Sequence, residues 1–132
     1  MELSKIDSSD MFHEIETLPE QIEYSIKIFD NFKSNIKNFS DINSIVLVGM
    51  GGSAIGGDII NSIISDKLSV PFQVIRDYNL PNWVDKNTLV FCVSYSGNTE
   101  ETLSCFNDAV KKKSKIVGIT SGGKLYKSLN EL

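Results

Sequence analysis

The sequence predicts an α/β fold: a doubly wound parallel sheet in three layers, with a helical N-terminal lead-in. Four short runs rich in β-branched and apolar residues follow residue 40. They are Ser44–Val48, Phe72–Ile75, Thr88–Val93 and Lys115–Ile119. Helix-like segments separate the first run from the second and the third from the fourth, which implies right-handed crossovers and a parallel sheet. The runs lack polar alternation, as expected of strands that are covered on both faces.

The first element is a helical segment over residues 1–40. Apolar residues recur there at near-helical spacing. They are Ile22, Ile26, Phe29, Ile36 and Phe39. Pro19 suits the first turn of this helix, and a shorter helix is expected over residues 10–17. We expect residues 1–40 to contribute packing and residues 41–132 to form the α/β domain.

Two helices are expected to connect the strands. The first covers residues 53–65 and carries a stripe of isoleucines, and the second covers residues 99–112. A glycine pair after the fourth strand precedes residues 124–132, which read as the beginning of another helix. A doubly wound sheet normally continues beyond that point. We therefore expect this sequence to be a truncated domain of a longer protein.

Composition and charge exclude several classes of protein. The 132 residues are 41% hydrophobic and 23% charged, which fits a soluble globular domain. No apolar run approaches the ~18 residues of a membrane helix, and no signal peptide is recognisable, so a cytoplasmic protein without a membrane partner is expected. The net charge of −4 argues against a broad surface for nucleic acid. An anion must therefore be bound locally, by backbone N–H groups and hydroxyls.

Cysteine and histidine content exclude two further kinds of site. Cys92 and Cys105 are too few for a disulfide framework and read as buried free thiols. His13 is the single histidine, which excludes a histidine-based metal site. We therefore expect no histidine-bound metal.

Loops rich in glycine and hydroxyl groups follow two of the predicted strands. Residues 49–57 read GMGGSAIGG, and residues 94–102 read SYSGNTEET. Small residues let the backbone approach a ligand closely, and a following helix offers free N–H groups to an anion. Ligands of open α/β sheets bind outside the carboxyl ends of the strands, so the two loops together predict a phosphate cradle. Residues 120–123, TSGG, repeat the pattern more weakly.

Purely structural explanations remain open for parts of these loops. Ser53 could simply cap the helix that follows it. Asn98 with Glu101 resembles a capping box. Gly56 and Gly57 lie within the predicted helix, where close packing onto a strand or partner would explain them. None of these explanations accounts for the hydroxyls of the second loop.

A dinucleotide site is a weaker alternative. The residues Gly49, Gly51 and Ala54 fit a relaxed form of the dinucleotide fingerprint, and Asp77 follows the second strand. However, Asp77 lies 28 residues after Gly49, later than the usual ~20. The hydroxyl-rich loop also has no part in that fingerprint.

Four segments together resemble the sugar isomerase (SIS) domain, and more narrowly the N-terminal half of the bifunctional phosphoglucose/phosphomannose isomerase family. They are residues 48–58 (VGMGGSAIGGD), 76–78 (RDY), 94–103 (SYSGNTEETL) and 118–123 (GITSGG). The resemblance extends over about residues 10–132. It implies a flavodoxin- or Rossmann-like sheet of five parallel strands, two such domains in a chain, and a homodimer.

The resemblance also implies an activity and a set of substrate contacts. The family interconverts glucose 6-phosphate or mannose 6-phosphate with fructose 6-phosphate through ring opening and a cis-enediol, without a cofactor. By position in the motifs, phosphosugar binding falls to six residues. They are Gly51, Gly52, Ser53, Ser94, Ser96 and Thr99.

The resemblance leaves the catalytic residues of this chain unknown. In the family, the glutamate base and the ring-opening histidine belong to the second half, and His13 matches neither role. Glu100 and Glu101 lie in a first helical turn, which favours a dipole and capping role over that of a base. We therefore expect this chain alone to be inactive. The alternative function is a phosphosugar-sensing module of a regulator, because SIS domains also occur in regulators.

Overall fold

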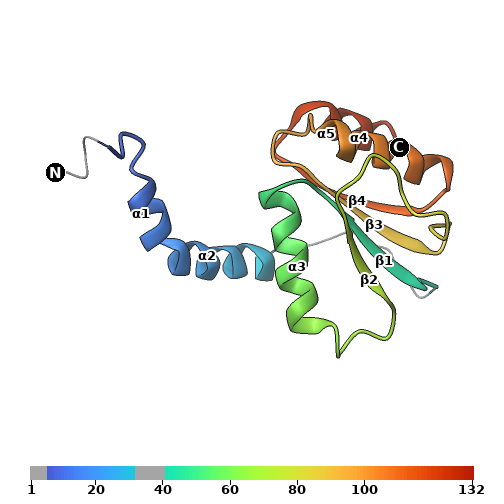
Figure 1. The fold of residues 1–132 in the computed structure, drawn as a ribbon, viewed down its shortest axis with the longest axis horizontal. Helices are drawn as coiled ribbons and strands as arrows, with labels where there is room; N and C mark the ends of the chain where they lie inside the picture. The colour runs from blue at the N-terminus through green and yellow to red at the C-terminus, as the bar shows by residue number, and fades with distance from the viewer. Residues whose placement is uncertain (1–5, 32–40) are drawn as a thin grey trace. The chain divides into compact units, whose positions relative to one another are not determined.

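The computed structural model describes residues 6–31 and 41–132 (Figure 1). The chain divides into two compact units, Met1–Asn38 and Phe39–Leu132. The first unit contains helices α1 (Met11–Glu16) and α2 (Leu18–Asn31). Both helices were predicted from the sequence, although the expected positions Ile36 and Phe39 lie outside the described residues.

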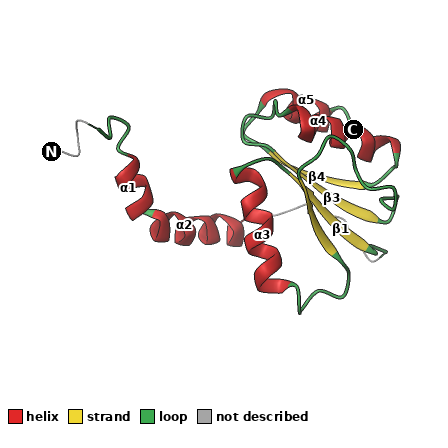
Figure 2. Cartoon of the chain, in the orientation of Figure 1, coloured by secondary structure: helices red, strands yellow, loops and turns green. Residues whose placement is uncertain are grey.

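The second unit alternates strands with helices, as the sequence predicts (Figure 2). Its elements are β1 (Ser44–Val48), α3 (Gly52–Ile64), β2 (Phe72–Ile75), β3 (Thr88–Val93), α4 (Glu100–Lys111), β4 (Lys115–Ile119) and α5 (Gly123–Asn130). The four strands form one parallel sheet in the order β2-β1-β3-β4. The described residues therefore contain four strands, where the family resemblance implies five for a domain.

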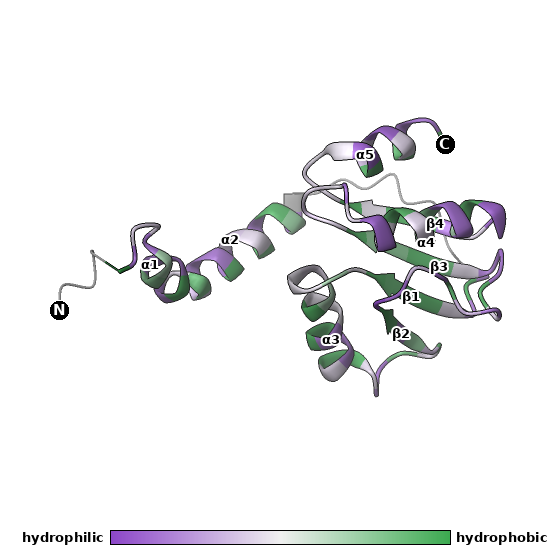
Figure 3. Cartoon of the chain, turned by 45° about the horizontal axis from the view of Figure 1, so that its top comes forward, coloured by the Kyte–Doolittle hydropathy of each residue, from purple (hydrophilic) through white to green (hydrophobic). Residues whose placement is uncertain are grey.

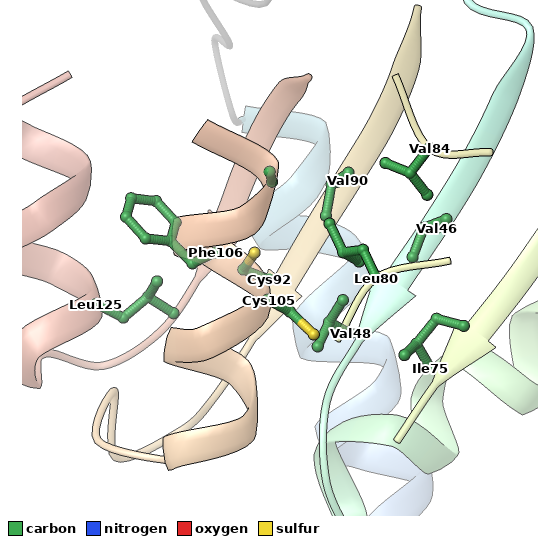
Figure 4. Packing of buried hydrophobic residues seen from close by; sticks show 11 residues of the cluster. Val46, Val48, Ile75, Leu80, Val84, Val90, Cys92, Cys105, Phe106 and Leu125 are labelled. Atoms are coloured by element: carbon green, nitrogen blue, oxygen red, sulfur yellow. The ribbon is translucent and has the colours of Figure 1, made fainter. Parts of the chain in front are cut away.

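Helices cover both faces of this sheet, so the three-layer, doubly wound prediction is confirmed. Alternate residues of a strand face opposite sides. On one face, Leu47 of β1 lies against Gly57 of α3. On the other face, Val46 and Val48 belong to a buried cluster with Cys105 of α4 (Figure 4).

Hydrophobic residues concentrate along the strands of the sheet (Figure 3). The buried cluster joins β1, β2, β3, α4 and α5 with the connection between β2 and β3. Leu80 and Val84 of that connection are buried in the cluster, which fixes an otherwise irregular segment to the core. No helix among residues 6–31 and 41–132 is long and apolar enough to cross a membrane.

The strand register brings three loops together at one edge. Val48, the last residue of β1, pairs with Cys92 of β3, and Cys92 pairs with Gly118 of β4. The loops after these strands therefore begin side by side. The chain crosses from β1 through α3 to β2 on one side and from β3 through α4 to β4 on the other, so β1 and β3 flank the point where strand order reverses. Ligands of doubly wound sheets bind there.

Candidate functional site

A cavity of about 710 Å³ opens at the carboxyl ends of β1, β3 and β4. Its lining residues come from all three loops and the strand ends beneath them. They are Met50, Gly52, Ser53, Val93, Tyr95, Ile119, Thr120 and Ser121. Tyr95 is 82% exposed. The volume falls within the range of cavities that hold small organic ligands.

The first loop turns sharply to begin α3. Gly51 precedes the helix with φ +51°, a left-handed conformation that favours glycine. At Gly49, an added Cβ would lie 3.1 Å from the backbone of Ser53, so the loop folds closely onto the first turn of α3. Ser53 is the second residue of the helix and lines the cavity, and the capping explanation for Ser53 is therefore wrong.

The second loop is held together by its own hydroxyls. The Ser94 side chain is buried, with its Oγ 2.8 Å from the Oγ1 of Thr99. The same Oγ accepts the N–H of Gly97 at 3.1 Å. Thr99 is the N-cap residue of α4, and its side chain makes no capping hydrogen bond to the helix. The structure therefore brings Ser94 and Thr99 together at the start of α4, as the cradle hypothesis requires.

Ser96 and Asn98 lie at the exposed turn of the second loop. The Ser96 Oγ accepts the backbone N–H of Asn98 at 3.2 Å. The Asn98 side chain donates to the Ser96 carbonyl at 3.0 Å and accepts the N–H of Lys124 at 3.2 Å. The capping-box explanation for Asn98 and Glu101 is therefore wrong, because the Asn98 amide is engaged elsewhere.

The six residues expected from the sequence fall into two neighbouring groups. Gly52 and Ser53 line the cavity, and Gly51 sets the turn that precedes them. The three hydroxyl residues of the second loop lie outside the cavity lining. From that loop it is Tyr95 that reaches the cavity. The second loop and the cavity therefore lie at the same edge of the sheet, but the hydroxyl residues Ser94, Ser96 and Thr99 lie next to the cavity and do not line it.

Sequence reasoning missed six of the eight cavity residues, two of which, Val93 and Ile119, are the last residues of β3 and β4. Met50 and Tyr95 lie inside the two loops that it singled out, and Thr120 and Ser121 belong to the weaker third loop. The N–H of Ser121 donates to the Tyr95 carbonyl at 3.1 Å, which joins the third loop to the second. The sequence did contain a signal for Thr120 and Ser121, because their loop directly follows a strand that was predicted to be parallel to the others.

Acidic groups near the site have partners of their own. The negative charge of Glu101, helped by burial and by Glu100, raises the pKa of Tyr78 above its usual 10.0. These glutamates occupy the first turn of α4, where they complement the helix dipole, and neither lines the cavity.

At the end of β2, Arg76 forms an ion pair with Asp58 of α3. No cluster of three or more metal-ligating side chains occurs within residues 6–31 and 41–132.

Comparison with known proteins identifies close relatives. Residues 38–125 match the family model of the SIS domain. The bifunctional phosphoglucose/phosphomannose isomerase of Caldicellulosiruptor bescii is 50% identical over 115 residues, which are 87% of this chain and 34% of that protein. The enzyme of the same name from Thermoplasma acidophilum is 43% identical over 112 residues, 85% of this chain and 32% of that protein. The chain thus spans about a third of the length of these relatives.

A solved structure shares the fold. The tagatose-6-phosphate ketose/aldose isomerase of Escherichia coli superimposes with a TM-score of 0.69 at 23% identity. The match covers 91% of this chain and 37% of that protein.

Proposed function

This chain belongs to the SIS domain family, and on that premise we propose that it binds a phosphorylated hexose at the carboxyl edge of its sheet. The observation that carries the proposal is the meeting of a glycine-rich turn and a hydroxyl-rich loop beside one cavity. The names of its relatives support an isomerase that interconverts glucose 6-phosphate or mannose 6-phosphate with fructose 6-phosphate.

The phosphate is held by the second loop and the start of α4. Ser96 and Thr99 present hydroxyls there, and the first N–H groups of a helix have no partner within it. Buried Ser94 holds the Thr99 hydroxyl in place through their 2.8 Å contact. The positive end of the helix dipole adds a favourable field for a dianion. This arrangement suits a protein whose net charge is −4, because it needs no lysine or arginine at the anion.

The sugar occupies the adjoining cavity. Gly51 allows the backbone turn, and Gly52 and Ser53 form the wall on the α3 side. Thr120 and Ser121 line the cavity from the loop after β4. The reaction opens the ring and moves a proton between C2 and C1 through a cis-enediol, which calls for a carboxylate or similar base. The cavity lining contains no acidic side chain or histidine, so the contribution of this chain is binding and orientation.

Assembly and location follow from the same premise. We place the protein in the cytoplasm, where sugar phosphates are metabolised, and we propose a homodimer. Helix α3 supports the dimer, because Ile55, Ile59 and Ile63 are each more than half exposed along its length. An exposed apolar stripe of this kind is typical of a surface that a partner covers.

The decisive experiment replaces two hydroxyls of the second loop. We expect the double variant Ser96→Ala with Thr99→Val to lose about a hundredfold or more in affinity for fructose 6-phosphate, because hydrogen bonds to a charged group contribute roughly 1.5–3 kcal/mol each. Binding of fructose should barely change. Isothermal calorimetry with both sugars gives the affinity ratio that isolates the phosphate contribution.

A control variant separates this effect from general damage. Ser62→Ala removes a hydroxyl that bonds to the Ile59 carbonyl within α3, away from the strand ends, and should bind like the wild type. An unchanged ratio in a folded double variant would place the phosphate at the turn formed by Gly51 to Ser53. Tighter binding of NAD than of fructose 6-phosphate would instead favour a dinucleotide site.

A further inference from the structure

The turn between β4 and α5 is bonded directly to the second loop. The N–H of Leu125, in the first turn of α5, donates to the Gly97 carbonyl at 2.9 Å. The N–H of Ser121 donates to the Tyr95 carbonyl, and the Ser121 hydroxyl donates to the same oxygen. Two segments that lie more than 20 residues apart in the sequence are therefore joined by two backbone hydrogen bonds and one from a side chain.

Two glycines allow these segments to touch. At Gly97, with φ +65°, an added Cβ would lie 1.8 Å from the Gly122 carbonyl oxygen. At Gly123, with φ +72°, it would lie 2.3 Å from the Ser96 carbonyl oxygen. Neither position has room for any side chain, so the backbones are in direct contact. Any displacement of α5 would therefore displace the turn that carries Ser96.

The Asn98 side chain closes the same junction. Its Nδ2 donates to the Ser96 carbonyl and its Oδ1 accepts the N–H of Lys124, the second residue of α5. Helix α5 has no side-chain cap from its own N-cap residue, Gly122, so Asn98 supplies an acceptor from another segment. One partner requires a donor and the other an acceptor, and a single carboxamide provides both.

We propose that Asn98 is a positioning residue that orients Ser96 for phosphate binding by tying the second loop to α5. The inference rests on the proposed function and deepens it. Asn98 would not touch the ligand. It holds the Ser96 carbonyl through its side chain and the Ser96 hydroxyl through its backbone N–H. Because the Asn98 side chain is exposed, its removal should leave the core intact.

The test compares Asn98→Ala with the wild-type chain, using fructose 6-phosphate, inorganic phosphate and fructose as probes. We expect the affinities for fructose 6-phosphate and for inorganic phosphate to fall by about tenfold, because in the variant the second loop must be ordered at the moment of binding. Affinity for fructose should change less than twofold, and the unfolding temperature should stay close to that of the wild type. Asn130→Ala is the matched control. It removes a carboxamide bond to the Tyr126 carbonyl at the far end of α5 and should change none of these affinities.

A ligand-free measurement tests the tether itself. Asn98→Asp keeps an acceptor for the Lys124 N–H but cannot donate to the Ser96 carbonyl. Amide hydrogen exchange should therefore accelerate at Asn98 in this variant, while Lys124 stays protected. In Asn98→Ala, both amides should exchange faster. Unchanged exchange at Asn98 and Lys124 in both variants would overturn the inference.

The binding outcomes separate this inference from the proposed function. If the wild type binds fructose 6-phosphate and Asn98→Ala binds it equally well, the positioning role is wrong and the proposed function stands. If the wild type binds neither fructose 6-phosphate nor inorganic phosphate, both the positioning role and the proposed function are wrong. If Asn98→Ala does not fold, the positioning role is also wrong, because the side chain would then be part of what holds the domain together.

Discussion

Two threonines of the α/β unit are fully buried but differ in their hydrogen bonding. The Thr88 Oγ1 lies 2.9 Å from the Ser44 Oγ and accepts the N–H of Asp85 at 3.1 Å. The Thr102 Oγ1 in α4 has no partner among the described residues. A buried hydroxyl without a partner destabilises the folded state by its lost hydration.

Replacing each threonine with valine should therefore have opposite effects. We expect Thr102→Val to raise the free energy of unfolding by about 1 kcal/mol, because it removes an unsatisfied group at nearly constant volume. Thr88→Val should lower it by about 1–3 kcal/mol, because it leaves the Asp85 N–H without its acceptor. Urea unfolding followed by circular dichroism gives both values. Destabilisation by Thr102→Val comparable to that by Thr88→Val would contradict the assignment.

Single polar side chains were the least predictable part of the site. The sequence suggests a cap at Ser53 and a capping box at Asn98, since both patterns use only neighbours in the chain. The structure instead gives the Asn98 amide a partner, Lys124, that lies 26 residues away. Local patterns cannot anticipate a competitor that only the fold brings near.

At the scale of elements, helix α3 contains two adjacent glycines in different surroundings. A Cβ added at Gly57 would lie 3.0 Å from side-chain carbons of both Leu47 and Val74. A Cβ added at Gly56 would meet nothing within 4 Å. The sequence predicts close packing for both residues. That prediction is confirmed at Gly57, while at Gly56 no strand packs.

Alanine substitutions should separate the two glycines. Gly56→Ala should raise the free energy of unfolding by about 1 kcal/mol, the usual gain in helix propensity. Gly57→Ala should lower it, because overpacking costs about 1–3 kcal/mol and exceeds that gain. Thermal unfolding of the two variants with the wild type gives the comparison. Equal stabilisation by both would mean that α3 does not press on β1 and β2 as described.

Element boundaries were predictable to different degrees. All four strands have the predicted bounds, because each is a compact apolar run between turn-forming residues. Helices α1, α3 and α4 begin and end within one residue of expectation. Helix α5 ends at Asn130, two residues before the end of the expected segment, and the expected continuation of α2 toward Phe39 lies outside the described residues. Strand order was not predicted, because it depends on which runs pair across long separations. The sequence indicated the loop with Thr120 and Ser121 only weakly, and the strand order places this loop beside the other two at the cavity.

At the scale of the whole molecule, binding a sugar phosphate and converting it can depend on different groups. Parallel pairing collects three loops at one edge, and the lining of the cavity there is neutral. The sequence contains one histidine, His13, which belongs to the N-terminal unit. Among the residues that the structure describes, the cavity lining includes no Asp, Glu, Lys, Arg or His side chain.

We therefore expect this 132-residue chain to bind fructose 6-phosphate without converting it. The measurement is a coupled assay for glucose 6-phosphate formation, with a commercial isomerase as positive control. Turnover should stay below a hundredth of the ~10 s⁻¹ of a median enzyme. Faster turnover would direct attention to Glu100 and Glu101, and the variants Glu100→Gln and Glu101→Gln would show which one acts as the base.

The thiols of Cys92 and Cys105 are buried in the core, so their chemical modification reports how often the core opens. Burial raises the pKa of Cys92 to about 12 and that of Cys105 to about 11, so at pH 8 only about one thiol in ten thousand and one in a thousand are ionised. An alkylating reagent therefore modifies them chiefly when the core opens, and the labelling rate measures how often that happens. A ligand that binds only the closed form slows labelling in proportion to its occupancy. The affinity of a ligand that binds only the closed form can thus be measured without introducing a probe.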